Sequence, residues 1–325
     1  MRKLFVLFVL SVFPLWAGAQ EDFNALETPL TFEAVDGTVR VGIRNFFSSN
    51  QPTIQYRIDD GDWTDFTVTM TECEVGDPYN ANWIPAGKIV QIRSNEWPPM
   101  IMFDLDRIGD GLAIYCSSDC YVYGNIMSLE TYDYATNYDI PATFGCLFLD
   151  NTHIKNHPTK ALVLPSKTLS KSCYTAMFKG CTGLTVAPDL PATELPEYDT
   201  FFDKGCYERM FEGCTGLTAA PALPAKVLTK GCYSNMFNGC TNLKAVTCDA
   251  TDISAEYATK NWLNGVSTTG IFKKPASITD WQIGVSGIPV GWNIETSGLR
   301  GDLNNDGVVD AADLVILVNI ILGRE

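Results

Sequence analysis

The chain has 325 residues, an apolar content of 46% and a formal net charge of −15. This length suggests two or three domains, and the apolar content is enough to build a core. The negative charge argues against binding to nucleic acid or to anionic membrane surfaces, because both are themselves negatively charged.

Residues 1–19 have the features of a secretory signal peptide. Arg2 and Lys3 give a basic start, Leu4–Trp16 is an apolar core, and Ala17–Ala19 is a cleavage site of small residues. The apolar run is shorter than the roughly 18–20 residues of a membrane-spanning helix, and no cysteine follows the site to carry a lipid. We therefore predict a secreted or bacterial cell-surface protein that does not span the membrane.

Residues 20–128 have the pattern of β-strands. Apolar and polar residues alternate over 39–43 and over 53–58, and the apolar residues Trp63, Phe66 and Val68 follow a turn cluster of aspartates. This arrangement predicts a β-hairpin, and Ile89–Ile92 offers a further strand. Short strands with turns at this spacing predict an antiparallel β-sandwich-like module.

Three tryptophans of this module, Trp63, Trp83 and Trp97, admit two interpretations. Exposed side by side, they would form a platform on which sugars stack, whereas packed into the core or rim they would have a structural role.

One motif is written three times in the following region. It reads CYTAMFKGCTGLT from Cys173, CYERMFEGCTGLT from Cys206 and CYSNMFNGCTNLK from Cys232. The step from Cys206 to Cys232 is 26 residues, and the step from Pro165 to Pro191 is the same. A fixed period in this range predicts a solenoid, in which each unit buries its apolar face against its neighbours.

Within one copy, Tyr174, Met177 and Phe178 are spaced as on one face of a helical turn, and Gly180 is suited to end that turn. Leu184 begins a stretch short enough for one β rung. We therefore predict short rungs and short helices, stacked so that equivalent side chains form columns of leucines, cysteines and phenylalanines: Leu184, Leu217 and Leu243; Cys181, Cys214 and Cys240; Phe178, Phe211 and Phe237.

The F-x-G-C-T-x-L motif and the Leu-Pro-Ala segments downstream of it resemble the BspA-like type of bacterial surface leucine-rich repeat. The resemblance covers about half of the chain, and the predicted leucine-rich repeat solenoid, with its caps, spans residues 129–296. It implies an extracellular, non-enzymatic protein that adheres to a host or matrix surface or binds a protein ligand.

One spacing departs from this pattern. Fifteen positions separate Pro191 from Cys206, against eight between Pro165 and Cys173. The extra residues should bulge from the stack, and they carry three aromatic residues among acidic ones: Tyr198, Phe201 and Phe202. Aromatic anchors in a polar rim are typical of binding hot spots, so these three are the candidate partner-binding residues. The alternative is that they fold back onto the stack.

Eight of the eleven cysteines lie in or beside the repeats. They are interpreted as buried free thiols or as disulfides, and their spacing is not that of a zinc site. Cys116 and Cys120, outside the repeats, are the more plausible disulfide pair. His153 and His157 are the two histidines, and the polar sequence between them favours a surface pair over a zinc site.

Residues 297–325 hold the clearest chemical motif, because the sequence from Asp302 to Asp313 fits the D-x-[DN]-x-[DN]-G calcium loop of EF-hand type. Calcium takes six to eight oxygen ligands, and the loop offers carboxylates, an amide and one backbone carbonyl at the required positions. The predicted Ca²⁺ ligands are Asp302, Asn304, Asp306, Val308 through its carbonyl, Asp310 and Asp313.

The apolar segment Leu314–Ile321 should form a helix after this loop. A loop with Asp at the last ligand position and no helix before it resembles a dockerin repeat, which implies a cohesin-like module as a partner. A dockerin has two such repeats and this chain has one. The helix is therefore expected either to dock on the end of the repeats or to pair with another chain.

No sequence motif indicates an enzyme, because the chain contains no G-x-S-x-G, P-loop or G-x-G-x-x-G. The predicted function is that of an exported, non-enzymatic binding protein. Two alternatives stay open: an accessory subunit of a polysaccharide-degrading assembly tethered through its tail, and a carbohydrate-binding surface protein.

Overall fold

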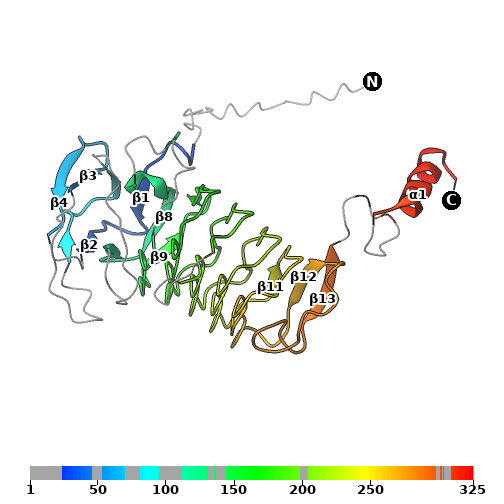
Figure 1. Cartoon of the computed structure of the whole chain (residues 1–325). Helices are drawn as coiled ribbons and strands as arrows, with labels where there is room; N and C mark the ends of the chain where they lie inside the picture. The colour runs from blue at the N-terminus through cyan, green and yellow to red at the C-terminus, as the bar shows by residue number, and fades with distance from the viewer. Residues whose placement is uncertain are drawn as a thin grey trace, which may run out of the picture.

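The computed structural model describes residues 24–45, 53–69, 81–94, 112–130, 135–136, 144–197, 204–297, 301, 303 and 309–324. The molecule is elongated, with most of its strands at the N-terminal end, a row of stacked turns in the middle and a helix beyond the C-terminal end of that row (Figure 1).

A seven-stranded sheet dominates the N-terminal end. Its strands follow the order β10-β8-β1-β6-β3-β4, with β9 also paired to β8. The bounds are β1 Leu30–Ala34, β3 Thr53–Ile58, β4 Thr64–Thr67, β6 Ile89–Ser94, β8 Cys120–Asn125, β9 Ile154–Asn156 and β10 Leu162–Val163. A second sheet has the order β5-β2-β7, with β2 Val41–Asn45, β5 Asn82–Trp83 and β7 Leu112–Cys116.

The hairpin predicted from the alternating residues is confirmed, because β3 and β4 pair antiparallel with Ile54 opposite Phe66. The module is not the predicted antiparallel sandwich. Two strands from the region of the repeats, β9 and β10, add to β8 in parallel, and the 3-10 helix η1, Ile126–Leu129, follows β8. The large sheet thus continues from the N-terminal strands into the stacked turns.

The repeated motif forms turns and no helix. Within each copy, alternate backbone N–H groups bond three residues back, as Met177 does to Tyr174, while the others bond to the next copy, as Phe178 does to Met210. Ala176 lies in the left-handed region at φ 53°, and Gly180 follows at φ 76°. A left-handed residue interrupts an α-helix, which is why the helical spacing of the apolar residues is misleading here.

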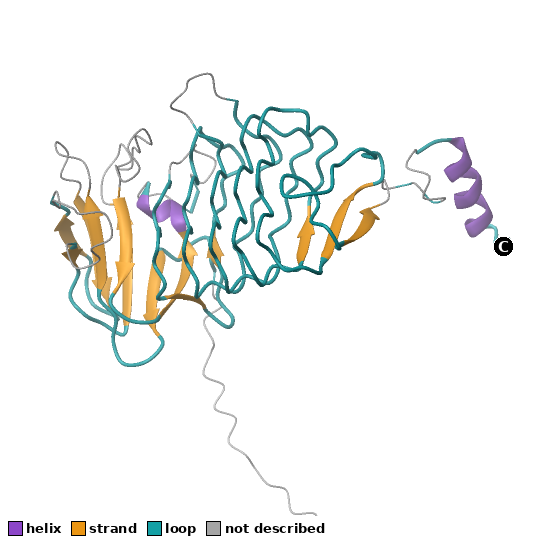
Figure 2. Cartoon of the chain, turned by 90° about the horizontal axis from the view of Figure 1, so that it is seen from below, coloured by secondary structure: helices purple, strands orange, loops and turns teal. Residues whose placement is uncertain are grey.

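These turns stack into a ladder, a name used here for the stacked copies of residues 144–297 (Figure 2). A series of backbone hydrogen bonds joins consecutive copies at each junction; between the second and third copies the donors in the turn are Tyr207, Arg209, Phe211 and Gly213. Rings stack as the alignment of copies predicts, with centroids 5.5 Å apart for Phe178–Phe211 and 5.6 Å for Phe211–Phe237.

A second column of rings runs beside the phenylalanines. It continues past the three motif copies at both ends, with adjacent centroids 5.8–6.2 Å apart. Its members in chain order are Phe144, Tyr174, Tyr207, Tyr233, Trp262 and Trp281. The apolar core of the ladder is therefore continuous from the degenerate first copy to the tryptophans of the last.

The C-terminal end carries a small parallel sheet and the α-helix. The sheet has the order β11-β12-β13, with β11 Ala245–Thr247, β12 Ile271–Pro275 and β13 Asn293–Ser297. Helix α1, Ala311–Ile321, is the one α-helix among the described residues.

The predicted fold class is therefore wrong. A leucine-rich repeat solenoid requires a regular rung and a helix in each copy, yet the described residues of the ladder hold short strands and no helix. The helix predicted over Leu314–Ile321 is present as α1, whereas the pair of helices of a complete EF-hand is not found in the described residues, where strand β13 precedes the loop. Three sheets and one α-helix replace the predicted sandwich, solenoid and EF-hand-like loop-helix.

Candidate functional site

The C-terminal loop is closed by one buried carboxylate. The Asp313 side chain is 3% exposed. Its Oδ1 accepts the backbone N–H of Leu303 at 2.7 Å, and its Oδ2 accepts the N–H of Asp310 at 2.8 Å. Asp313 therefore ties together the start and the end of the predicted calcium loop.

Asp310 is the N-cap residue of α1, and it also takes part in the contact with Asp313. Its carboxylate accepts the backbone N–H of Ala312 at 2.7 Å, and the Asp310–Asp313 pair forms a capping box. Such a cap satisfies N–H groups that the first helical turn leaves without partners. The sequence places a helix start here, and the structure supplies the polar contacts that fix it.

Two of the predicted calcium ligands, Asp310 and Asp313, lie in the described residues. A carboxylate oxygen that accepts one N–H keeps a further lone pair, and hard oxygen ligands are what calcium takes. The other predicted ligands, Asp302, Asn304, Asp306 and Val308, lie outside the described residues. Within the part of the chain that the structure describes, no group of three or more His, Cys, Asp or Glu side chains could hold a metal.

The aromatic residues of the predicted partner loop, Tyr198, Phe201 and Phe202, also lie outside the described residues. The described start of the insertion packs on the ladder, since Leu195 belongs to its apolar core.

The two histidines have separate partners. His153 is exposed, and its Nδ1 lies 2.9 Å from Asp119 Oδ1. The His157 ring packs edge-on against Tyr121 and Tyr123, with centroids 5.2 Å apart in each case.

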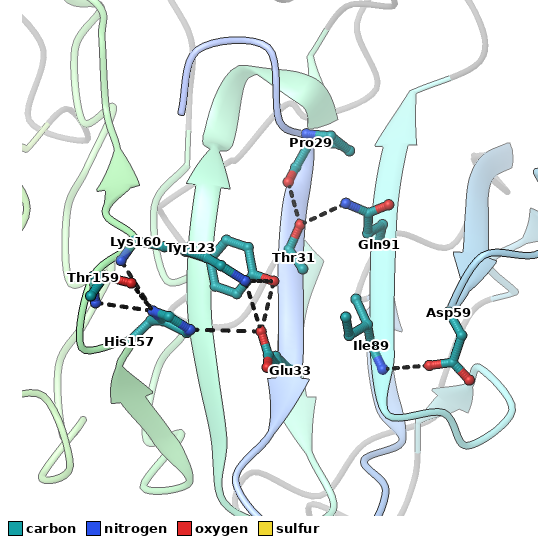
Figure 3. A network of polar contacts seen from close by, with 10 residues as sticks. All are labelled: Pro29, Thr31, Glu33, Asp59, Ile89, Gln91, Tyr123, His157, Thr159 and Lys160. Atoms are coloured by element: carbon teal, nitrogen blue, oxygen red, sulfur yellow. Dashed lines mark hydrogen bonds and ion pairs between the residues drawn. The ribbon is translucent and has the colours of Figure 1, made fainter. Parts of the chain in front are cut away.

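His157 belongs to a polar cluster on the large sheet (Figure 3). Glu33 Oε2 accepts hydrogen bonds from Tyr123 Oη at 2.9 Å and from Lys160 Nζ at 3.1 Å, and it lies 3.8 Å from His157 Nε2. Burial alone would raise the pKa of Glu33, but these donors outweigh it and lower that pKa. The cluster joins β1, β8 and the loop after β9.

The tautomer of His157 follows from its other nitrogen. Nδ1 accepts the backbone N–H groups of Thr159 at 3.1 Å and Lys160 at 3.0 Å. Nδ1 therefore carries no proton, and Nε2–H faces Glu33. Burial, with the charge of Lys160 adding to it, lowers the pKa of His157. The sequence gives no signal for this cluster, because its members are far apart along the chain.

The tryptophan platform is not the arrangement found. Trp63 packs against the guanidinium groups of Arg93 and Arg57, at 3.9 and 5.1 Å from its ring centroid. Trp83 packs against Arg40 in the other sheet at 5.1 Å. Trp97 lies outside the described residues. Trp63, just before β4, and Trp83, in β5, are thus each a cation–π partner of arginine.

The ten described cysteines are free and buried. The thiols of Cys181, Cys214 and Cys240 each donate at 3.0 Å to a phenylalanine carbonyl of the preceding copy. Burial raises the pKa of Cys240 to about 12, so it is not a reactive thiolate. Of the two interpretations, buried thiols are what the structure shows, and Cys116 and Cys120 are free as well.

Helix α1 carries exposed apolar side chains on all sides: Leu314, Val315, Leu317, Val318, Ile320 and Ile321. Within the described residues, no helix combines the length and the apolar character needed to cross a bilayer.

Neither the known family models nor the curated proteins nor the solved structures include a match to this chain.

Proposed function

We propose that this chain is an exported or cell-surface, non-enzymatic binding protein whose ladder is a rigid body for contact with a protein ligand or a host or matrix surface. The observation that supports this is the continuity of the ladder. Every junction between copies combines backbone hydrogen bonds with stacked rings, so the exposed side chains of successive copies keep a fixed spacing.

The experiment is adhesion of the mature protein to decellularised matrix and to intact cells. Replacing Phe201 and Phe202 by Ala should reduce the bound fraction, because aromatic anchors carry much of the free energy of binding at hot spots. This variant is preferable to a deletion starting at Glu194, which would remove the buried Leu195. A matched control is Val186→Ala, an exposed apolar residue of the ladder. Binding that is equal in all three proteins would contradict the assignment of these aromatics.

The proposal includes one calcium ion bound by residues 302–313. When bound, calcium supplies positive charge that offsets the clustered carboxylates. Titration calorimetry of the mature protein should show a single site, with a dissociation constant between roughly 10 µM and 1 mM, the range spanning sensor and extracellular sites. Asp306→Ala should abolish the heat.

The control for this titration is Asp249→Asn, an exposed acid that pairs with Lys226 at 3.4 Å in the ladder. If Asp306→Ala binds calcium as the natural sequence does, the loop is not the site.

A second candidate function is tethering to a partner through the tail, as for an accessory subunit of a polysaccharide-degrading assembly. The exposed apolar surface of α1 favours it. Pull-down with a cohesin-like module, with and without chelator, separates the two functions, since adhesion through the ladder does not require that module.

A further inference from the structure

The apolar core of the ladder is left open at its C-terminal end. Val246, Phe272 and Ile294 are aligned across the parallel pairs of β11, β12 and β13. The first two are 2% and 0% exposed, whereas Ile294 is 45% exposed. The inward-facing position that is buried in β11 and β12 is therefore uncovered in β13.

The rest of the last layer, residues 276–297, agrees with this. It exposes the apolar side chains of Ile283, Val285 and Val290. It also buries the indole N–H of Trp281, which has no acceptor among the described residues. A buried donor without an acceptor is costly, so this layer is incomplete both in apolar cover and in hydrogen bonding.

Helix α1 carries an exposed apolar surface that could cover the exposed apolar residues of the last layer. Leu314, Leu317, Val318 and Ile321 fall at i, i+3, i+4 and i+7 and form one apolar stripe. All four are exposed, Ile321 to 73%. Moving this stripe out of water would stabilise the chain roughly in proportion to the apolar area that is buried.

The length of the connecting segment and the net charge of the chain favour docking of α1 on its own ladder over pairing with a second copy. Thirteen residues, 298–310, connect β13 to α1. Because Asp313 holds Leu303 beside the start of the helix, the stretch that can extend is residues 298–302, which spans at most about 16–18 Å. A tether of that length holds the helix near the ladder end at an effective concentration of the order of millimolar. A second copy would meet the helix without that advantage and against a formal net charge of −15 on each chain.

We propose that α1 docks in the same chain on the C-terminal end of the ladder, with its Leu314–Ile321 stripe over Ile294 and the last layer. The structure shows α1 apart from this surface (Figure 1), so docking is a second arrangement of the same chain. The side of the helix away from this stripe, with Ile316 and Asn319, stays uncovered and remains available to a partner.

The test is photo-crosslinking of the mature chain in calcium-containing buffer, with benzoylphenylalanine in place of Ile321. Irradiation should yield a monomeric crosslink that maps by mass spectrometry to residues 276–297, with a yield independent of protein concentration. Adding Ile294→Asp should reduce this yield about tenfold, which corresponds to about 1.4 kcal/mol of docking free energy. The matched control places the probe at Asn319, on the side of the helix away from the stripe, where this crosslink should be weak.

Three results would overturn the proposal. They are a crosslink confined to a dimeric band, equal yields from positions 319 and 321, and a yield unchanged by Ile294→Asp. Because α1 and Ile294 are both solvent-exposed, neither change threatens folding of the ladder. Calcium uptake by the same samples reports on the proposed function separately, so that either idea can fail while the other stands.

Discussion

At the scale of single residues, polar contacts decide features that apolar patterns do not reveal. The sequence pattern predicts Cys214 to be a small buried apolar residue, but its thiol also donates to the Phe178 carbonyl of the preceding copy. Asp313 is a predicted metal ligand that also closes its own loop. The chemistry of each side chain was predictable from the sequence, whereas its partner was not. The partner of Cys214 comes from the preceding copy, and the partners of Asp313 depend on how its loop folds.

His157 should make stability depend on pH. Its pKa is lowered in the folded chain from the ordinary value of 6.5, so the unfolded chain binds the proton more readily. The stabilisation is fully present above pH 6.5 and is lost as the pH falls from there through the folded pKa. Protonation of Nδ1 would also remove the acceptor of two backbone N–H groups.

Urea unfolding between pH 7.5 and 5 measures this effect. His157→Gln should flatten the pH dependence in that window, whereas His153→Gln, at an exposed histidine, should keep it. Glu33 has a lowered pKa as well, and by the same sign its contribution is lost at lower pH, below its ordinary value of 4.5. Equal pH dependence in both histidine variants would contradict the role of His157.

At the scale of elements, strands were predictable and the repeated unit was not. The alternation at residues 53–58 and the apolar stretch at Ile89–Ile92 correspond to β3 and β6. The spacing of Tyr174, Met177 and Phe178 predicts a helix, but residues at left-handed φ interrupt each copy. The backbone takes this path because half of its N–H groups then bond to the next copy. These hydrogen bonds form only when neighbouring copies are stacked, so the spacing of apolar residues within one copy cannot predict them.

Two glycines of one copy test this account of the unit. At Gly205 an added Cβ would lie 2.1 Å from the Gly231 carbonyl oxygen of the next copy. At Gly213, where φ is +74°, the nearest atom would be Gly180 Cα at 3.8 Å, an ordinary contact. Gly213→Ala should cost about 1–2 kcal/mol, the conformational penalty of a left-handed residue.

Gly205→Ala should cost about 3 kcal/mol or more, because backbone of the next copy cannot move aside without breaking the junction. Urea unfolding of the two variants gives the comparison directly. A smaller loss for Gly205→Ala than for Gly213→Ala would mean that the copies do not stack as described.

At the scale of the whole molecule, the repetition in the sequence corresponds to one uninterrupted ladder that begins on the large sheet and ends at β13. The calcium site and the partner loop remain predictions, since most of their residues lie outside the described part of the chain. The proposed binding role depends on a rigid ladder, and rigidity requires that the copies protect one another as a unit.

Native-state hydrogen exchange of the mature protein measures that requirement directly. The amide N–H groups of Phe178, Phe211 and Phe237 each bond to the next copy, and they should exchange with the same free energy of opening, equal to that of global unfolding. Separate free energies for the three amides, with one copy opening while its neighbours stay closed, would contradict a single rigid ladder.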